Sequence, residues 1–479
     1  MAIEFGSSGT PADVITQPDN KIIMLSSCRT LLQIPAAPFC IVRLNEDSTL
    51  DTTFNNTGYT FTLVPGSPGD TGGATAAALQ SDGKLVAVGT APLQSRDNVV
   101  LIRYNSDGSL DNTFGTNGIA TRVFTNNSKA LNVVIQPDGK ILIVGISGSD
   151  QFVARYNADG TLDNAFGTNG VTKLSIPGNS TSGNSIALLP GGKIITGGYM
   201  WGNSQTAPAF PMLARFNRNG TLDPTFDDDG IRTIPNSGPG FFGNSLISIA
   251  VQSDGRILAL SDKNNLYRFN SDGSFDTGFD QDGSRRALNG TSDAYDLYVT
   301  PSGKITVVGN PTLPQSGGIS IDFRIARFRP DGMPDPNFSD DGYLDVNVVG
   351  YLDGALGVTA DVNGRIVIGG RWAYGVVGNP WETPRYCAAR LLATPAQNVG
   401  FSGRVFRSDG RALANAHLTL RNGSELIGYS RTNPFGYFQF KNIPSNQTYT
   451  FSVNSKSASF PDRNVLVDDE INNYLIVAE

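Results

Sequence analysis

Residues 136–171, QPDGKILIVGISGSDQFVARYNADGTLDNAFGTNGV, carry the pattern from which most of this 479-residue chain is built. The stretch contains a tight turn at residues 137–139, an apolar run at residues 141–144 and a second extended run that ends at Tyr156. A long polar turn follows, and a third extended run begins after Gly170. Similar stretches recur until about residue 392, so this pattern determines the architecture of most of the chain.

The repeat can be counted on the basic residue that follows the tight turn. Seven copies align on Lys21, Lys84, Lys140, Lys193, Arg256, Lys304 and Arg365. Copies 48 to 63 residues apart indicate one supersecondary unit each, and four short antiparallel strands are the usual content of such a unit. Residues 141–144 are apolar at successive positions, so both faces of this strand are expected to be buried, as in a propeller blade between two others. The sequence therefore predicts an all-β fold with a seven-bladed β-propeller over residues 1–393.

The two ends of the repeat region indicate how the propeller closes. The seventh copy stops after its third strand, near residue 392, without the polar turn or a fourth strand. Residues 2–5, AIEF, come just before the first copy, where a fourth strand would be expected. We therefore expect the N-terminal strand to complete the seventh blade, because this leaves no exposed sheet edges at the ends of the ring.

An arginine, an aspartate and a phenylalanine recur at fixed spacing in six copies. The aspartate follows the arginine by eight residues and the phenylalanine follows three residues later. The pairs of the second to fourth copies are Arg103 with Asp111, Arg155 with Asp163, and Arg215 with Asp223. A charge ladder that binds a ligand is conceivable, but a feature present in every copy favours a structural ion pair with a phenylalanine plug.

The connection between the second and third strands varies in length, in contrast to the polar turn. The separation between the basic residue and the strand arginine ranges from 12 to 25 residues. Antiparallel geometry places these loops on one rim and the constant turns on the other, so the variable rim is the expected binding face. Two of these loops contain an off-pattern set of residues: Tyr199, Trp201, Arg371, Trp372, Tyr374 and Trp381. Such aromatics suit a glycan or protein partner, and equally a long loop that buries its own tryptophans.

The repeats resemble a known family. The combined form Q-x-D-G-K-I, A-R-Y-N-x-D-G-S-L-D-x-T-F-G-x-N-G-I is similar to the delta-60 repeats of bacterial propeller proteins over about residues 11–392. Three copies depart from it: Asn20 replaces the turn glycine, Gly191 and Gly192 replace Asp-Gly, and the seventh copy is truncated. The resemblance implies an extracellular or envelope-associated bacterial protein.

A second domain follows a linker at residues 394–397. Seven short strands alternate with turns over residues 398–479, which predicts a small seven-stranded β-sandwich. This region resembles the carboxypeptidase-regulatory-like, or transthyretin-like, domain, with matching residues Gly403, Gly410, Ala416, Gly436, Phe438, Phe440, Pro444 and Tyr449. In that family the module accompanies other domains and is not the peptidase. His417 has no second histidine or nearby glutamate in metal-ligand spacing, so a peptidase site is not supported.

Composition excludes several classes of function. The net charge is −7, and no cluster of Lys and Arg exists to neutralise nucleic-acid phosphates. No apolar run approaches 18 residues, so no membrane insertion is expected. The N-terminus lacks the basic and apolar regions of a signal peptide, which together with the family resemblance suggests a mature or trimmed extracellular form.

The cysteines leave two interpretations open. Cys28 and Cys40 flank one expected hairpin loop and are placed either for a cross-strand disulfide or as two small half-buried side chains. Cys387 would remain free.

Few residues of the propeller are candidates for catalysis or for binding a metal ion. The only histidine lies outside the repeats, so no His-based triad or metal site can form on the propeller. Three acidic turns, at residues 227–230, 280–283 and 339–342, resemble calcium loops, and the candidate ligands are Asp227, Asp229, Asp280 and Asp282. The equivalent positions in other copies read GTNG, which is neutral, so a plain glycine turn is the other interpretation. No other cofactor is expected.

These observations favour a non-enzymatic binding or adhesion module that presents the variable rim to a protein or glycan partner. The open edges of the C-terminal sandwich add the hypothesis of self-association. The alternative is a carbohydrate-active or other hydrolase or lyase working at the central channel through off-pattern carboxylates: Asp70, Asp293, Asp296 and Asp353.

Overall fold

The computed structural model describes residues 2–3, 11–27, 38–67, 72–122, 124–202, 209–234, 245–289, 292–311, 323–339, 341–346, 352–373, 385–391, 398–445, 447–468 and 471–478. These residues form strands and turns, and no helix occurs among them. No helix in this described part of the chain therefore has the length and hydropathy needed to span a bilayer.

Seven four-stranded antiparallel sheets make up the repeat region, and each is called a blade. Blades 1 and 2 contain β2 (Pro11–Thr16), β3 (Ile22–Ser27), β4 (Phe39–Leu44) and β5 (Tyr59–Thr62), then β6 (Gly73–Leu79), β7 (Leu85–Leu93), β8 (Arg96–Tyr104) and β9 (Ile119–Arg122). Blades 3 and 4 contain β10 (Ser128–Ile135), β11 (Ile141–Ser147), β12 (Asp150–Tyr156) and β13 (Val171–Leu174), then β14 (Asn179–Leu188), β15 (Ile194–Gly202), β16 (Ala209–Phe216) and β17 (Ile231–Thr233). Blades 5 and 6 contain β18 (Leu246–Val251), β19 (Ile257–Ser261), β20 (Asn265–Phe269) and β21 (Ser284–Arg286), then β22 (Ser292–Val299), β23 (Ile305–Pro311), β24 (Phe323–Phe328) and β25 (Tyr343–Val346). Blade 7 contains β26 (Leu352–Ala360), β27 (Ile366–Ala373), β28 (Arg385–Arg390) and β1 (Ala2–Ile3).

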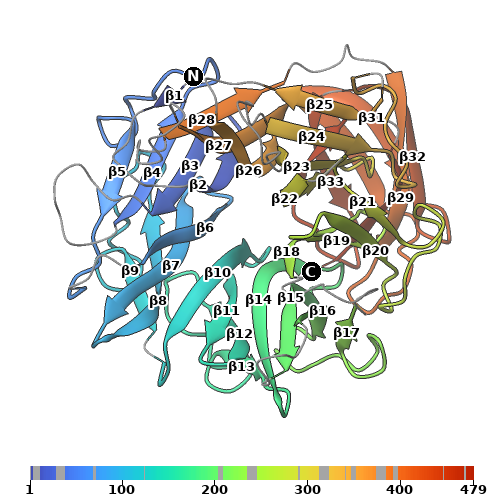
Figure 1. The fold of residues 1–479 in the computed structure, drawn as a ribbon. Coiled ribbons are helices and arrows are strands. Elements are labelled where there is room, and N and C mark those ends of the chain that lie inside the picture. The colour runs from blue at the N-terminus through green and yellow to red at the C-terminus, as the bar shows by residue number, and fades with distance from the viewer. Residues whose placement is uncertain are drawn as a thin grey trace.

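The first strand of each blade lies at the centre of the molecule (Figure 1). Each of these inner strands packs against the inner strand of the next blade, and β26 packs against β2. Sheets arranged around a common centre in this way form a β-propeller. The all-β propeller expected from the repeats is therefore present.

Blade 7 combines the two ends of the repeat region. β1 pairs with β28, with Ala2 opposite Cys387 and Ile3 opposite Tyr386, at the position where the sequence analysis places a fourth strand. An apolar cluster joins the same blade to blade 1, since Val14 and Met24 pack with Val367 and Ala388. Strand pairing and side-chain packing thus both connect the first blade to the last.

The second strand of each blade is buried on both faces, as its apolar run predicts. In β11, Ile141 and Ile143 pack in a core cluster with blade 2, whereas Leu142 and Val144 pack in a cluster with blade 4. All four side chains have no exposed surface. Successive side chains of a strand point to opposite faces, so one continuous apolar run joins three blades.

Residues 398–478 form two further sheets. One has the order β32-β29-β35 and the other β31-β30-β33-β34. Their bounds are β29 (Asn398–Phe406), β30 (His417–Asn422), β31 (Glu425–Arg431), β32 (Tyr437–Pro444), β33 (Gln447–Asn454), β34 (Arg463–Val467) and β35 (Ile471–Val477). Both sheets contribute to one apolar core that includes Phe401, Leu418, Phe440 and Phe451. We call this region the C-terminal domain.

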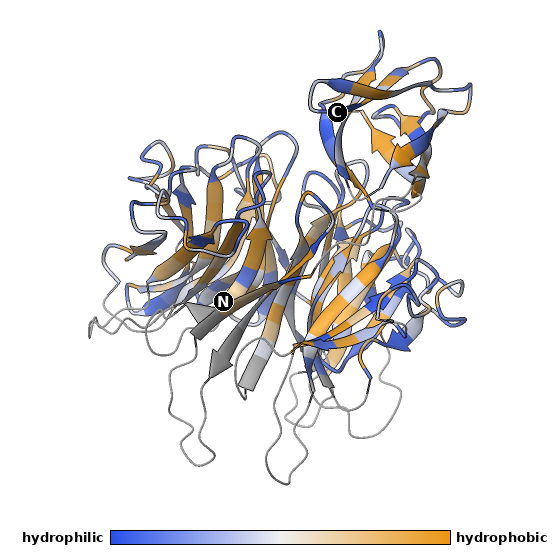
Figure 2. Ribbon diagram, turned by 90° about the horizontal axis from the view of Figure 1, so that it is seen from above, coloured by the Kyte–Doolittle hydropathy of each residue, from blue (hydrophilic) through white to orange (hydrophobic). Residues whose placement is uncertain are grey.

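The C-terminal domain stands on one face of the propeller (Figure 2). Its contacts are with the tight turns of blades 5, 6 and 7. The Leu475 N–H donates to the carbonyl of Ser253 (3.0 Å), the Ser302 hydroxyl donates to Asp468 Oδ2 (3.0 Å), and the Thr448 hydroxyl donates to the carbonyl of Val362. Because these turns lie on the constant face, the domain leaves the variable rim uncovered.

The cysteines are placed only in part. Cys40 is disulfide-bonded and Cys387 is fully buried. Cys28 lies outside the described residues, so the pairing of Cys28 with Cys40 stays a prediction.

Deleting residues 1–6 should destabilise the whole fold. The truncated chain loses the β1–β28 pairing and exposes the edge of β28, which we expect to cost about 2 kcal/mol, roughly 1 kcal/mol for each hydrogen bond lost. Differential scanning calorimetry should show a lower melting temperature. A chain of unchanged length with Gly at positions 2 and 3 serves as control and should keep part of the stability. Identical melting of the truncated and full chains would show that β1 does not secure blade 7.

Candidate functional site

The repeated arginine and aspartate form a buried ion pair in each blade that has both. The Nε of Arg103 lies 2.8 Å from Asp111 Oδ2, Arg155 lies 2.7 Å from Asp163, and Arg215 lies 2.6 Å from Asp223. Each guanidinium also stacks on the phenylalanine of its own turn, with Arg103 4.7 Å from the centre of the Phe114 ring. The arrangement matches the ion pair and plug that the spacing predicts.

The same arginines connect neighbouring blades. The Nη1 of Arg155 donates to the carbonyl of Arg218 in the next blade at 2.6 Å. Equivalent bonds run from Arg43 to Ser106, Arg103 to Ala158, Arg215 to Ser271, Arg268 to Pro330 and Arg390 to Glu46. In these six blades the repeated arginine therefore acts as a clamp between neighbouring blades.

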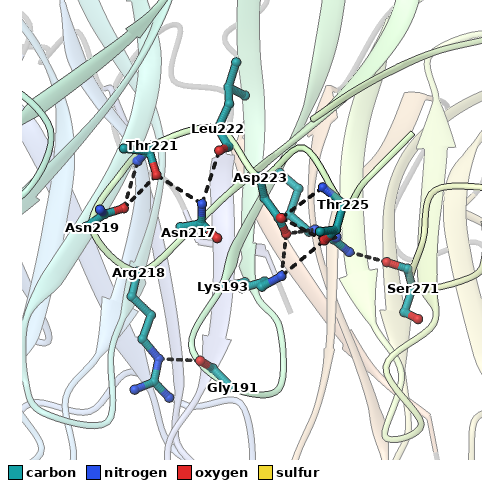
Figure 3. Close-up of polar contacts among 11 residues, drawn as sticks. Gly191, Lys193, Asn217, Arg218, Asn219, Thr221, Leu222, Asp223, Thr225 and Ser271 are labelled. Carbon is teal, nitrogen blue, oxygen red and sulfur yellow. Dashed lines mark hydrogen bonds and ion pairs between the residues drawn. The ribbon is translucent and has the colours of Figure 1, made fainter. Parts of the chain in front are cut away.

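A second cation joins each pair, a role that the sequence analysis did not assign. Lys140 lies 2.7 Å from Asp163 Oδ2, and Lys193 lies 2.6 Å from Asp223 Oδ2 (Figure 3). Partial burial opposes the charged form of Asp223, but hydrogen bonds from Lys193 and Thr225 lower its pKa to about 2. Each unit thus holds two cations and one carboxylate, and the presence of a basic residue after the tight turn in every copy was the available signal.

Blade 7 lacks the aspartate of the polar turn and uses another residue instead. Asp361, at the position of the repeated glutamine, lies 2.6 Å from Arg365 Nε and 3.3 Å from Arg390 Nε. Its side chain is fully buried. A carboxylate from a different part of the repeat therefore completes the charge cluster of the truncated copy.

Hydrogen bonds at one shared position also join the inner strands of several neighbouring blades. Each inner strand has a β-bulge at the same point, for example between Pro11 and Asp13 in β2 and between Ala294 and Asp296 in β22. The residue after the bulge reaches the next blade: Asp13 Oδ2 accepts from the Ala77 N–H (3.1 Å). Equivalent bonds join Ser185 to Ile249, Ser248 to Asp296 and Asp296 to Val358.

Two of the bulge residues are carboxylates in unfavourable surroundings. Burial raises the pKa of Asp13 to about 7, hydrogen bonds from Ala77 and Val14 oppose this, and the negative charge of Asp296 adds to it. Burial likewise raises the pKa of Asp296 to about 6. Between them in the ring, blade 7 carries Gly357, where an added Cβ would lie 3.8 Å from Asp296 Oδ2. The two groups titrate near neutral pH but are bound to backbone N–H groups.

The structure places the side chains of two of the four carboxylates proposed for an enzyme, Asp293 and Asp296. Asp296 follows the bulge of β22, as Asp13 follows the bulge of β2. The sequence did not point to Asp13, because this residue precedes the first tight turn and belongs to no motif. Asp293 is exposed on β22. For Asp353 only the backbone in β26 is described, and Asp70 lies outside the described residues. Within the described ranges, no group of three or more His, Cys, Asp or Glu could hold a metal ion.

The four aspartates proposed for calcium have other partners. Asp227 pairs with Arg232 (2.9 Å), and Asp280 lies 3.5 Å from Arg285. Asp229 accepts from the Ile231 N–H and Asp282 from the Ser284 N–H, both at 2.8 Å. These bonds are those of short polar turns closed by a carboxylate.

The aromatic residues of the variable rim are described in blade 4. Trp201 and Tyr199 lie near the end of β15, and Trp201 is 45% exposed while Tyr199 is partly buried. In blade 7 only the backbone positions of Arg371 and Trp372 in β27 are described, and Tyr374 and Trp381 lie outside the described residues. Exposed Trp201 shows that at least one tryptophan of the rim is available to a partner.

A cavity of about 680 Å³ lies between the propeller and the C-terminal domain. Its floor consists of the tight turns and inner-strand ends of blades 3 to 6, including Leu189 and Val251, and its roof includes Tyr474 and Val477. This pocket is on the constant face, where the sequence analysis expected no binding site.

Comparison with known proteins supports the fold. A family described as "Domain of unknown function (DUF5122) beta-propeller" matches residues 39–54, 80–114, 136–166, 189–226, 252–279 and 300–338. Each matched segment ends at the plug phenylalanine or its equivalent, from Phe54 to Phe338, so the family model describes the clamp and its flanking strands. No curated protein matches the sequence.

Several solved structures are similar at low identity. The WD40 β-propeller domain of Doa1 is 12% identical, with 80% of this chain and 94% of that chain covered and a TM-score of 0.41. YCF48 bound to D1 peptide is 9% identical, with 82% and 97% covered and a TM-score of 0.42. The α-L-arabinofuranosidase Arb93A from Fusarium graminearum, in complex with an iminosugar inhibitor, is 8% identical, with 68% and 98% covered and a TM-score of 0.41.

Stability should rise as the pH falls from roughly 8 to 5. The folded-state pKa of Asp13, about 7, lies above the ordinary value of 3.8, so the folded protein binds more protons in this range and loses stability as the pH rises. Melting curves should show this slope, and Asp13→Asn should reduce it, since Asn132 already occupies the same position in blade 3. Asp107→Asn, in an exposed turn, is the matched control. An unchanged slope in Asp13→Asn would contradict the assignment.

Proposed function

We propose that this protein is a non-enzymatic extracellular or cell-surface module that binds a protein or glycan partner through the variable rim of its propeller. The observation that carries the proposal is the asymmetry of the two faces. One face is occupied by the repeated clamps and by the C-terminal domain. The other carries loops of unequal length and the exposed Trp201. Large exposed aromatics outside the repeated pattern are typical of binding surfaces.

The proposal includes a seven-bladed ring and a carboxypeptidase-regulatory-like sandwich. The seven four-stranded sheets and the contact between β26 and β2 support the ring. The common apolar core of the two C-terminal sheets supports the sandwich. The domain then serves as a spacer that holds the propeller with its variable rim directed away.

Catalysis at the channel has one observation in its favour, the raised pKa values of Asp13 and Asp296. Both carboxylates, however, accept hydrogen bonds from backbone N–H groups of the neighbouring blade. Carboxylates committed to the scaffold in this way suit ring stabilisation better than general acid–base chemistry. Binding without catalysis is therefore the better supported function.

Replacing Trp201 should abolish partner binding without changing stability. We expect Trp201→Ala to lose at least about 2 kcal/mol of binding free energy, as hot-spot tryptophans do. The partner is first found with a glycan array and a pull-down from extracellular proteins, and its affinity is then measured by calorimetry. Met333→Ala is the matched control, since Met333 is similarly exposed (41%) but lies on the constant face. If both variants bound the partner equally well, the binding site would lie away from the variable rim.

Self-association through the C-terminal domain is a separate expectation. β31 is an edge strand that pairs only with β30, and it carries the exposed Leu426 and Tyr429. Unpaired edges with apolar side chains are sites of strand addition. Light scattering should give a larger mass for the full chain than for a shortened chain ending at Pro395. If the full chain and the shortened chain are both monodisperse monomers at high concentration, self-association through this domain is wrong.

A further inference from the structure

The pocket beneath the C-terminal domain contains a positive charge that no other blade has. The carbonyl that receives the arginine clamp belongs to Glu46, Ser106, Ala158, Ser271 or Pro330 in other copies, but to Arg218 in blade 4. Arg218 is exposed and lines the pocket. Within the described residues it has no ion pair.

A second departure of blade 4 from the repeat accompanies Arg218. In blades 1, 2, 3 and 5 the tight turn carries an aspartate at this position, and Asp82 lies 3.8 Å from Lys84. Blade 4 has Gly191 instead, and the Arg218 Nε donates to the Gly191 carbonyl (Figure 3). An added Cβ at Gly192 would lie only 2.7 Å from that Nε. Arg218 and Gly191 together place the guanidinium against the tight turn of blade 4 and remove the carboxylate that would neutralise its charge.

The roof of the pocket adds another arginine. Arg463 of β34 lines the cavity, and its only side-chain hydrogen bond to the described residues is a long one, 3.4 Å, from Nη2 to the Val477 carbonyl. Its charge favours the ionised form of nearby Tyr474, although burial has the larger effect and raises the pKa of that phenol. Floor and roof therefore each supply one guanidinium without a carboxylate partner.

The remaining walls are mainly apolar. They include Leu188, Leu189, Val251, Val299, Leu475 and Val477. The acidic group of the lining is Asp138, whose Oδ1 accepts from the Lys140 N–H in its own turn, and the third arginine, Arg155, is already paired with Asp163. The volume of about 680 Å³ falls in the range of small-molecule sites. Guanidinium groups select oxyanions, and an apolar wall selects a hydrocarbon body.

We propose that this pocket binds an amphipathic organic anion, with its carboxylate between Arg218 and Arg463 and its apolar body against the β35 roof. The site is independent of the variable rim. Because its two sides belong to different domains, the bound anion would also hold the C-terminal domain on the propeller.

Calorimetry on the full chain can test the proposal with three probes of matched chemistry: decanoate, decanol and acetate. Decanoate should bind, and the affinities for decanol and acetate should each be lower by a factor of about ten or more. Decanol lacks the negative charge, and acetate lacks the hydrocarbon body. Decanoate should also raise the melting temperature. Equal binding of decanol, equal binding of acetate, or no binding of decanoate would each overturn the proposal.

Variants locate the site. Arg218→Ser installs the residue that blades 2 and 5 carry at this position, so the fold should be kept while decanoate affinity falls about tenfold. Arg463→Gln should have a similar effect from the other side. Arg329→Gln is the control, because Arg329 is an exposed turn arginine paired with Asp331 and does not line the pocket. Unchanged decanoate affinity in both pocket variants would overturn the proposed pocket. Loss of partner binding in Trp201→Ala would concern only the variable rim and would leave the proposed pocket unaffected.

Discussion

The structure depends on one buried interaction, the clamp in which an arginine binds the aspartate of its own blade and the backbone carbonyl of the next. A buried guanidinium needs a partner for its charge and acceptors for its N–H groups, and the clamp supplies both. The phenylalanine ring covers the remaining face of the cation. Since the carbonyl belongs to the neighbouring blade, six of the blades need the next one to satisfy their own arginine. The side-chain contacts within one blade therefore depend on how the neighbouring blades pack together.

The truncated seventh copy shows how strict this requirement is. Blade 7 has no aspartate from a polar turn, and Asp361, at a position held by a neutral residue in the other blades, supplies the buried carboxylate for Arg365 and Arg390. Arg365 also forms an ion pair with Glu46 of blade 1. Arg390 still reaches blade 1 through the Glu46 carbonyl. The chain thus keeps the charge balance of the clamp while it changes the residues that provide it.

The two faces of the propeller follow from this constraint. Clamps and tight turns fill the constant face, so variation there is limited to positions that the clamp does not use. Blades 4 and 6 vary at those positions: Gly191 removes a turn carboxylate beside Arg218, and Ser302 replaces one and donates to Asp468 of the C-terminal domain. The loops of the opposite rim differ in length from copy to copy. A binding surface can therefore diversify on the variable rim without loss of the fold.

The sequence by itself determined the repeat, the doubly buried second strand, the arginine–aspartate pairs and the position of the N-terminal strand. These features depend on residues close together in the chain or on a pattern repeated many times, so spacing and hydropathy reveal them. Only the tertiary structure decided which single residues meet. Asp13 and Asp296 influence each other because blades 1 and 6 both pack against blade 7, which has only Gly357 between them. Ser302 meets Asp468 because the C-terminal domain folds back onto blades 5 to 7. Arg218 and Arg463 come to one pocket for the same reason. Contacts between residues more than a hundred positions apart follow from how the blades and the domain pack, and no local pattern in the chain records them.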